Sequence, residues 1–263
     1  MHHQPAGVLV EVDPQVIEPE VRQIAGHRVR RGETLRAIAR RHGTSAETLA
    51  RINGLGTVWL EVALPEANRA IAANPNLAPG YNLRGLINAA LGKDDAAESD
   101  FRRALAINPR DADALQNYGW YLCQHSRHEE ANAQFAQALA LPQRRESART
   151  WLAQGVCHAR AGRLEDAEKA LQRSYQMDAG NPSTSVNLAE VLLRRGEAER
   201  ARFHIRRVNA NVNYVSAQTL WLAVRIERRM GNSAGVQELG QQLLNRFPET
   251  REAVAFQRGQ FDE

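Results

Sequence analysis

A small residue recurs along this chain at nearly constant spacing, and this spacing limits the fold more than any other feature. The small residues are Gly85, Gly119, Gly155, Ala189 and Ala223, so successive steps are 34, 36, 34 and 34 residues. A second small residue follows each of them by 12 positions, at Ala97, Ala131, Ala167, Ala201 and Gly235. A large apolar residue comes four positions later, at Phe101, Phe135, Leu171, Ile205 and Leu239. The chain is therefore a repeat protein.

The repeat is typical of paired antiparallel helices. Small side chains let two crossing helices approach closely, and the large residue fills the space beside them. Gly92, Gly162 and Gly196 each fall seven residues after the first small position, where they end the first helix of a pair. A period near 34 with this order is the tetratricopeptide signature, and it predicts a mainly α, right-handed solenoid. Such arrays bind partners on a concave face, so we expect a scaffold and not an enzyme.

Composition excludes several other classes. The first residues, MHHQPAGVLVEVDP, lack the basic start and long apolar core of a secretory signal, and no run is long enough to span a membrane. The net charge of +4 comes almost wholly from arginine. The Arg-Arg pairs, such as Arg194-Arg195 and Arg228-Arg229, are spread along the chain near helix ends, where cations suit the helix dipole. We therefore interpret them as solvated helix surface, with an acidic partner surface as the alternative, and expect no nucleic-acid partner.

Catalytic and metal-binding patterns are not found in the sequence. It has no Ser-His-Asp arrangement, phosphate-binding glycine loop or Cys-x-x-Cys motif. His125, His128 and Glu129 could form half of a metal site, but a third ligand at helical spacing is missing. We expect no catalytic residue, no metal site and no cofactor.

The stretch from residue 26 to 65 has a different organisation, with a predicted order of strand, helix, helix and strand. Val58, Leu60, Val62 and Leu64 alternate along the chain, which favours a strand that ends at Leu64. Pro65 is a good first residue for the helix that follows. The array would then begin with a half-repeat.

This stretch resembles a LysM domain. The motifs are Gly-Glu-Thr-Leu, Ile-Ala, Arg-His-Gly-Thr and Arg-Ile-Asn-Gly-Leu between residues 29 and 55. The resemblance implies a βααβ module that binds N-acetylglucosamine polymers such as peptidoglycan. It places the sugar groove at Gly32, Glu33, Thr34, Leu35, Ile52, Asn53 and Gly54. The chain departs from the family after Leu55, so a LysM fold that no longer binds glycan is the alternative.

The repeats resemble the PilF/PilW family of type IV pilus biogenesis lipoproteins from about residue 66 to 263. The resemblance depends on segments such as Asn82-Leu83-Arg84-Gly85, Asn117-Tyr118-Gly119-Trp120 and Gln154-Gly155-Val156-Cys157. It implies an outer-membrane lipoprotein of six repeats that helps the pilus secretin reach the outer membrane and assemble. The chain lacks the lipidated cysteine of that family, and an export signal is likewise absent from it.

Cys123 and Cys157 are the two cysteines, and both fall on first helices of consecutive repeats. A disulfide is conceivable if their Cα atoms come within about 7 Å, and two buried thiols are the alternative. The PilF/PilW resemblance implies the disulfide, because members of the family carry cysteines in these segments.

Partner binding is expected on first-helix residues that are neither small nor part of the core. These are Asn82, Asn88, Gln116, Leu122 and Leu152. Amides mixed with leucine suit an extended peptide, since the amides hold its backbone and pockets take its side chains.

The sequence thus predicts a lead segment (1–25), a LysM-like domain (26–65), a tetratricopeptide array (66–250) and a tail (251–263). The function expected from the resemblances is a pilus-assembly scaffold that binds secretin, or another pilus assembly protein, and attaches to peptidoglycan. It would lie in the periplasm, associated with the outer membrane or the cell wall. The alternative is a peptidoglycan-binding envelope adaptor whose repeats recruit other proteins.

Overall fold

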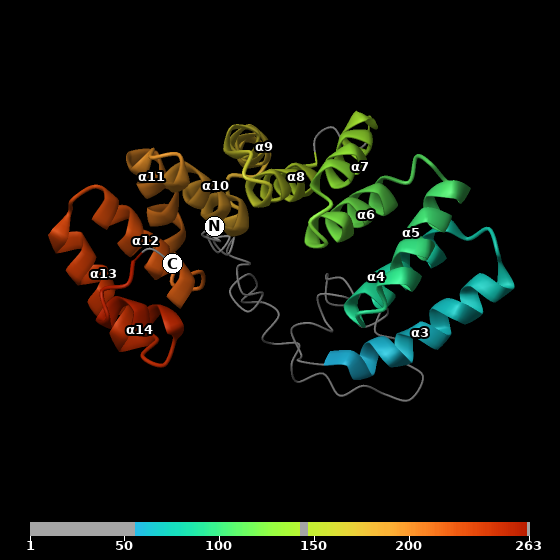
Figure 1. Cartoon of the computed structure of the whole chain (residues 1–263), viewed down its shortest axis with the longest axis horizontal. Helices are drawn as coiled ribbons and strands as arrows, with labels where there is room; N and C mark the ends of the chain where they lie inside the picture. Colours follow the sequence, from blue (N-terminus) through green and yellow to red (C-terminus); the bar gives the residue numbers. More distant parts are fainter. Residues whose placement is uncertain (1–55, 143–146, 262–263) are drawn as a thin grey trace, which may run out of the picture. The chain divides into compact units, whose positions relative to one another are not determined.

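The structure, a computed structural model, describes residues 56–142 and 147–261. These ranges belong to two compact units, which are described separately. All regular structure within the two ranges is helical (Figure 1). The unit of residues 56–142 contains α3 (Gly56–Ala73), α4 (Ala78–Ala90), α5 (Asp94–Ile107), α6 (Ala112–Gln124) and α7 (His128–Ala140).

The unit of residues 147–261 continues the same pattern. It contains α8 (Ala148–Arg160), α9 (Leu164–Met177), α10 (Pro182–Arg194), α11 (Ala198–Asn209), α12 (Ala217–Arg229), α13 (Ser233–Arg246) and α14 (Arg251–Gln257). In both units the even-numbered helices α4 to α12 are the first members of helical pairs, and each packs against the helix that follows it. The tetratricopeptide repeat predicted from the spacing is confirmed.

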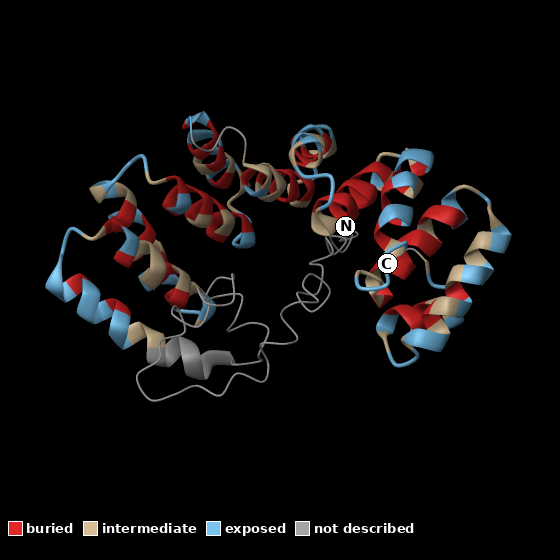
Figure 2. Ribbon diagram, turned by 180° about the vertical axis from the view of Figure 1, so that it is seen from behind, coloured by how far each residue is buried: buried red, intermediate tan, exposed pale blue. Residues whose placement is uncertain are grey.

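The recurring small residues lie where the two helices of a pair cross. A Cβ atom added to Gly85 would lie 3.0 Å from the ring of Phe101, and one added to Gly155 would lie 2.7 Å from Leu171 Cγ. Phe101 and Leu171 are themselves fully buried. Figure 2 shows buried residues along the contacts between paired helices and exposed residues on their outer sides. The small and large positions therefore act together, as steric reasoning predicts.

The ends of the first helices depend on a left-handed backbone conformation. Gly92, Gly162, Gly196 and Gly231 have φ between 68° and 82° at these ends. The corresponding residue after α6 is Ser126, with φ of 60°. An L-residue pays a steric cost in this region that glycine avoids, so this turn is locally strained.

The start of the array differs from the sequence prediction. Residues 58–64 were expected to form a strand and Pro65 to begin a helix, but α3 is continuous from Gly56 and contains Pro65. The segment is almost uninterruptedly apolar, so its alternation could not distinguish strand from helix. An interior proline removes one hydrogen bond of the helix and its ring crowds the preceding turn, but α3 continues through Pro65. The rest of the predicted LysM fold, with its seven groove residues, lies outside the described residues.

The C-terminal segment also differs from the expected tail. α14 packs against α12 and α13, and Ala253 of α14 joins Trp221 and Leu243 in one core cluster. The ring of Phe261 stacks on Trp221, with centroids 5.5 Å apart and planes at 15°. The sequence after α13 thus completes the core of this unit.

Among the helices described, none combines the length and apolar character required to cross a membrane.

Candidate protein-binding surfaces

The outward sides of the first helices were predicted to bind partners, and two of the five predicted residues are partly exposed. Asn82 on α4 is half-buried and accepts a hydrogen bond from Asn117 Nδ2 of α6 at 3.2 Å. Leu152 on α8, in the other unit, is also half-buried. Asn82 and Asn117 present a pair of neutral amides across consecutive repeats, a suitable arrangement for holding a peptide backbone.

The other three predicted contact residues are in the interior. Asn88 and Gln116 are each 5% exposed, and Leu122 is 0% exposed. Asn88 donates a hydrogen bond to buried Asp100 at 2.9 Å, so its amide stabilises the contact between α4 and α5. The prediction is wrong for these residues as surface contacts because of helical geometry. Residues three positions from the small residue lie near the side of the helix that faces the second helix, and packing there covers these three more completely than Asn82 and Leu152.

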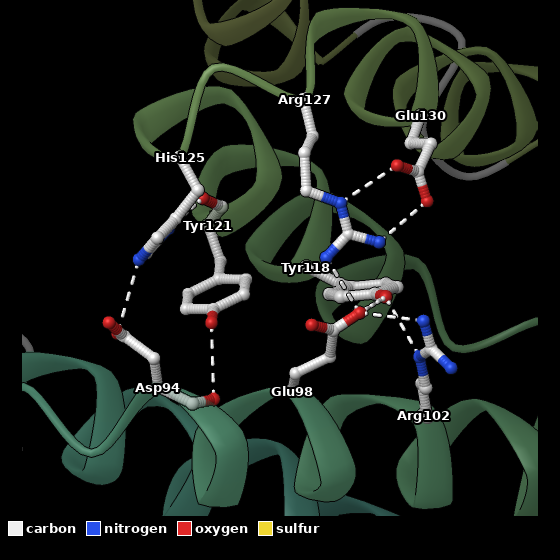
Figure 3. A network of polar contacts seen from close by, with 8 residues as sticks. All are labelled: Asp94, Glu98, Arg102, Tyr118, Tyr121, His125, Arg127 and Glu130. Carbon is white, nitrogen blue, oxygen red and sulfur yellow. Dashed lines mark hydrogen bonds and ion pairs between the residues drawn. The ribbon is translucent and has the colours of Figure 1, made fainter.

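A polar network joins α5, α6 and the start of α7 (Figure 3). Glu98 of α5 accepts hydrogen bonds from Tyr118 at 2.9 Å and from Arg102 and Arg127 at 2.7 Å each. The Arg127 guanidinium also contacts both carboxylate oxygens of Glu130, at 2.7 and 2.6 Å. Consecutive repeats are thus fastened by charge-assisted hydrogen bonds, which are stronger than neutral ones.

The network also sets the ionisation of its members. Burial acts to raise the pKa of Glu98, but the hydrogen bonds from Arg127 and Tyr118 outweigh it and lower that pKa below 4.5. Burial raises the pKa of Tyr118 above 10.0. Glu98 is therefore a carboxylate and Tyr118 a neutral phenol near neutral pH, so neither is poised to exchange a proton. We interpret the network as structural.

His125 lies beside this network and does not support the half metal site considered from the sequence. Its Nε2 is 3.1 Å from Asp94 Oδ1, and its Nδ1 is 2.8 Å from the backbone oxygen of Tyr121. Tyr121 in turn donates a hydrogen bond to the backbone oxygen of Asp94 at 3.1 Å. Figure 3 shows the two contacts side by side. These contacts link α5 with the end of α6.

The unit of residues 147–261 carries a basic pocket that the sequence prediction missed. The pocket has a volume of about 570 Å³ and is lined by Leu193, Arg194, Arg225, Arg228, Arg229 and Phe261. Except for Phe261, these residues come from the first helices α10 and α12. We call it the arginine pocket.

Equivalent positions of successive repeats carry the sequence signal for this pocket. Arg160, Arg194 and Arg228 all lie five residues after the small residue of their repeats, at successive steps of 34. Ala90 and Gln124 occupy the same position in the unit of residues 56–142. A position five residues along a helix points about 140° away from the small residue, so it is directed away from the paired helix. The adjacent Arg-Arg pairs, such as Arg194-Arg195, obscure this 34-residue periodicity in the sequence.

The two cysteines are buried but belong to different units. Cys123 on α6 is 1% exposed and Cys157 on α8 is 2% exposed. Their pairing stays a prediction.

Comparisons with known proteins bear on both parts of the chain. Tetratricopeptide repeat profiles match residues 78–111, 119–182 and 158–213. The LysM domain profile matches residues 27–58. The type IV pilus assembly protein PilF of Pseudomonas aeruginosa is 23% identical over 197 residues, which cover 75% of this chain and 78% of PilF.

Solved structures agree with the sequence comparison. The crystal structure of PilW, described as a widely conserved type IV pilus biogenesis factor, superposes with a TM-score of 0.71 and 29% identity. It covers 74% of this chain and 90% of PilW. This chain is a PilF/PilW-like tetratricopeptide-repeat protein with a LysM match. The structure of Pseudomonas aeruginosa PilF, at 22% identity, covers 76% of this chain and 90% of PilF, with a TM-score of 0.67. The tetratricopeptide repeats and the likeness to PilF and PilW agree with the expectation of a non-enzymatic scaffold.

Proposed function

We propose that this PilF/PilW-like protein is a scaffold for type IV pilus biogenesis. The observation that carries the proposal is the extent of the likeness, since PilF matches over 75% of the chain and PilW over 74%. Both relatives are named for type IV pilus assembly or biogenesis. The repeat array supplies protein-binding surface, and the scaffold assists the pilus secretin in assembling or localising at the outer membrane.

The LysM module would attach this scaffold to peptidoglycan in the periplasm. The profile match over residues 27–58 includes all seven residues of the predicted sugar groove. Attachment to the wall would hold a repeat scaffold at a fixed place in the envelope without a membrane-spanning helix.

A disulfide between Cys123 and Cys157 fits this compartment, because the periplasm is oxidising. The test is the mass of the denatured protein after alkylation, with and without prior reduction. We expect label on both cysteines only after reduction. Label on unreduced protein would contradict the disulfide and favour two buried thiols.

Sedimentation with insoluble peptidoglycan tests the LysM part. The full chain is compared with the groove variant Glu33→Arg/Asn53→Arg and with a control, Gln176→Arg/Glu199→Arg. The control residues are exposed in the unit of residues 147–261. We expect the parent and the control to sediment with the wall material and the groove variant to stay in solution. Equal retention of all three would contradict glycan recognition by the groove.

Complementation tests the role in the pilus. Cells that lack the protein are supplied with the full chain, with the groove variant, or with an empty vector, and assembled secretin in the outer membrane is measured. Restoration of assembled secretin by the full chain is expected. If secretin is unaffected by loss of the protein while the chain still binds peptidoglycan, the envelope adaptor is the correct function. The LysM match favours that second candidate.

A further inference from the structure

We propose that the arginine pocket binds an acidic segment of a partner protein, in which carboxylate side chains alternate with apolar ones. This site goes beyond the pilus and peptidoglycan roles proposed above. The lining contains four arginines and no acidic side chain. Such a concentration of positive charge in a recess favours ligands with several carboxylates.

Contacts behind the pocket hold two of the arginines in place. Arg194 donates a hydrogen bond to the backbone oxygen of Ala159 at 3.1 Å. Arg225 contacts the carboxylate of buried Glu190, also at 3.1 Å. Both contacts join first helices of consecutive repeats, so the stacking of the repeats fixes these guanidinium groups before a ligand arrives. Pre-ordered side chains lose less entropy on binding.

Aromatic stacking orders a third arginine. The guanidinium carbon of Arg228 lies 4.0 Å from the centroid of the Phe261 ring, and Phe261 stacks on Trp221. A stacked guanidinium keeps its N–H groups at the edge, where they can donate two parallel hydrogen bonds to a carboxylate. The helix dipole alone would account for cations at the ends of α10 and α12. It does not account for the aromatic stack or for arginines of two helices lining one pocket.

The apolar part of the lining favours a peptide over other polyanions. Leu193 and Phe261 are half-buried and lie beside the arginines. An apolar side chain next to an acidic one would contact them while its neighbour pairs with a guanidinium. A nucleic acid would instead need an extended basic track interleaved with stacking aromatics. The arginine pocket is an open recess with three exposed arginines, Arg194, Arg228 and Arg229, and it is lined by six residues and not by an extended track.

Fluorescence anisotropy with the full chain tests the proposal. The probe is a labelled octapeptide of alternating aspartate and leucine, and the comparison peptide has asparagine in place of aspartate. We expect the asparagine peptide to bind at least about tenfold more weakly, since it lacks the charges that the pocket would pair. Equal affinity of the two peptides would overturn the proposal.

Charge-reversal variants locate the binding. Arg228→Glu/Arg229→Glu changes two exposed residues of the pocket, whereas Arg206→Glu/Arg207→Glu makes the same change at an exposed arginine pair on α11. The control pair also has a nearby ring, because Arg207 lies 5.8 Å from the Phe203 centroid. We expect the pocket variant to weaken binding by about tenfold or more and the control by less than about twofold. Equal losses would show general charge attraction and contradict the pocket.

Phe261→Ala tests whether Phe261 forms a wall of the arginine pocket or covers the binding site. If Phe261 forms a wall, its loss weakens peptide binding several-fold. Tighter binding would show that Phe261 covers the site, and this would contradict the proposed lining. Circular dichroism checks that each variant is folded.

Competition with single-stranded DNA tests the choice of ligand class. Displacement of the peptide by this DNA, at equal concentrations of phosphate and carboxylate groups, would overturn the choice of an acidic peptide.

Discussion

The units of residues 56–142 and 147–261 share one repeat but place their charges differently. Both units carry charged contacts between helices, such as Glu98 with Arg127 and Glu168 with Arg200, but only in the first do the neutral amides of Asn82 and Asn117 meet on the first helices. In the second, Arg194 and Arg228 line a pocket on the first helices. The repeat fixes which positions pack and leaves outward positions free to change. One backbone pattern can therefore present surfaces of different chemistry.

The cores differ as well. Phe101 contacts the rings of Tyr118 and Tyr121, with centroids 5.7 and 5.5 Å apart. The corresponding large residues in the second unit include Leu171 and Ile205, which are also fully buried. An aromatic cluster thus replaces aliphatic packing at equivalent repeat positions.

The largest expected effect comes from removing the centre of the aromatic cluster. Phe101→Ala should lower the free energy of unfolding by about 3–5 kcal/mol, because it deletes a fully buried ring. It should also change the near-ultraviolet circular dichroism of Tyr118 and Tyr121. The matched variant Leu171→Ala should destabilise without that spectral change. A loss below about 1 kcal/mol for Phe101→Ala would mean that the aromatic cluster is not a core.

The next prediction compares one carboxylate from each unit. Glu227 is 4% exposed and contacts Arg202 at 2.7 Å, whereas Glu98 is 24% exposed. We expect Glu227→Gln to cost about 3 kcal/mol, at the lower end for breaking a buried ion pair, since Glu227 is buried but Arg202 is partly exposed. Glu98→Gln should cost about 1.5–3 kcal/mol, because solvent partly replaces the lost partner.

Chemical denaturation at neutral pH measures both losses, with Glu238→Gln as the control on the exposed side of α13. The control should change stability by less than about 0.5 kcal/mol. A larger loss at Glu98 than at Glu227 would reverse the comparison.

Acid should affect the two units through different groups. The pKa of Glu98 is lower than 4.5 in the folded protein, so its contribution is present above that pH and is lost as the pH falls through the lowered pKa. Burial lowers the pKa of His204 on α11 below 6.5, and Arg200 and Arg207 act in the same direction. Unfolding therefore takes up a proton at His204, and stability should begin to fall below about pH 6.5.

Denaturation curves from pH 7 down to about pH 2 would measure these two effects. His204→Gln should flatten the decline in the free energy of unfolding that starts near pH 6.5. The difference in stability between Glu98→Gln and the parent should disappear at lower pH. If His204→Gln leaves the upper part of the profile unchanged, another group causes it.

The smallest expected effect concerns the turn after α6. Ser126→Gly should stabilise the protein by about 1 kcal/mol, because it removes the cost of an L-residue at positive φ. Gly162→Ser makes the reverse change in the other unit and should destabilise by a similar amount. Thermal unfolding of both variants checks the pair. A destabilising Ser126→Gly would show that the serine side chain stabilises this turn.

Much of the fold could be predicted because the repeat is encoded locally. The small positions Gly85 and Gly155, the large positions Phe101 and Leu171, and the glycines that end helices each have a steric role that the sequence displays directly. Their spacing of about 34 residues determined the helical pairs. The PilF/PilW likeness likewise depended on segments around these positions.

Tertiary structure decided which side of each helix is accessible and what happens at the ends of the array. Asn88 and Leu122 occupy first helices as predicted, but packing against the second helix buries them. Residues 58–64 read equally as strand or helix, and α3 is helical there. The arginine pocket needs Phe261, which reaches α12 only through the packing of α14. Sequence periodicity records the repeated contacts within a helical pair. Contacts that occur once, between distant residues, arise only when the chain has folded.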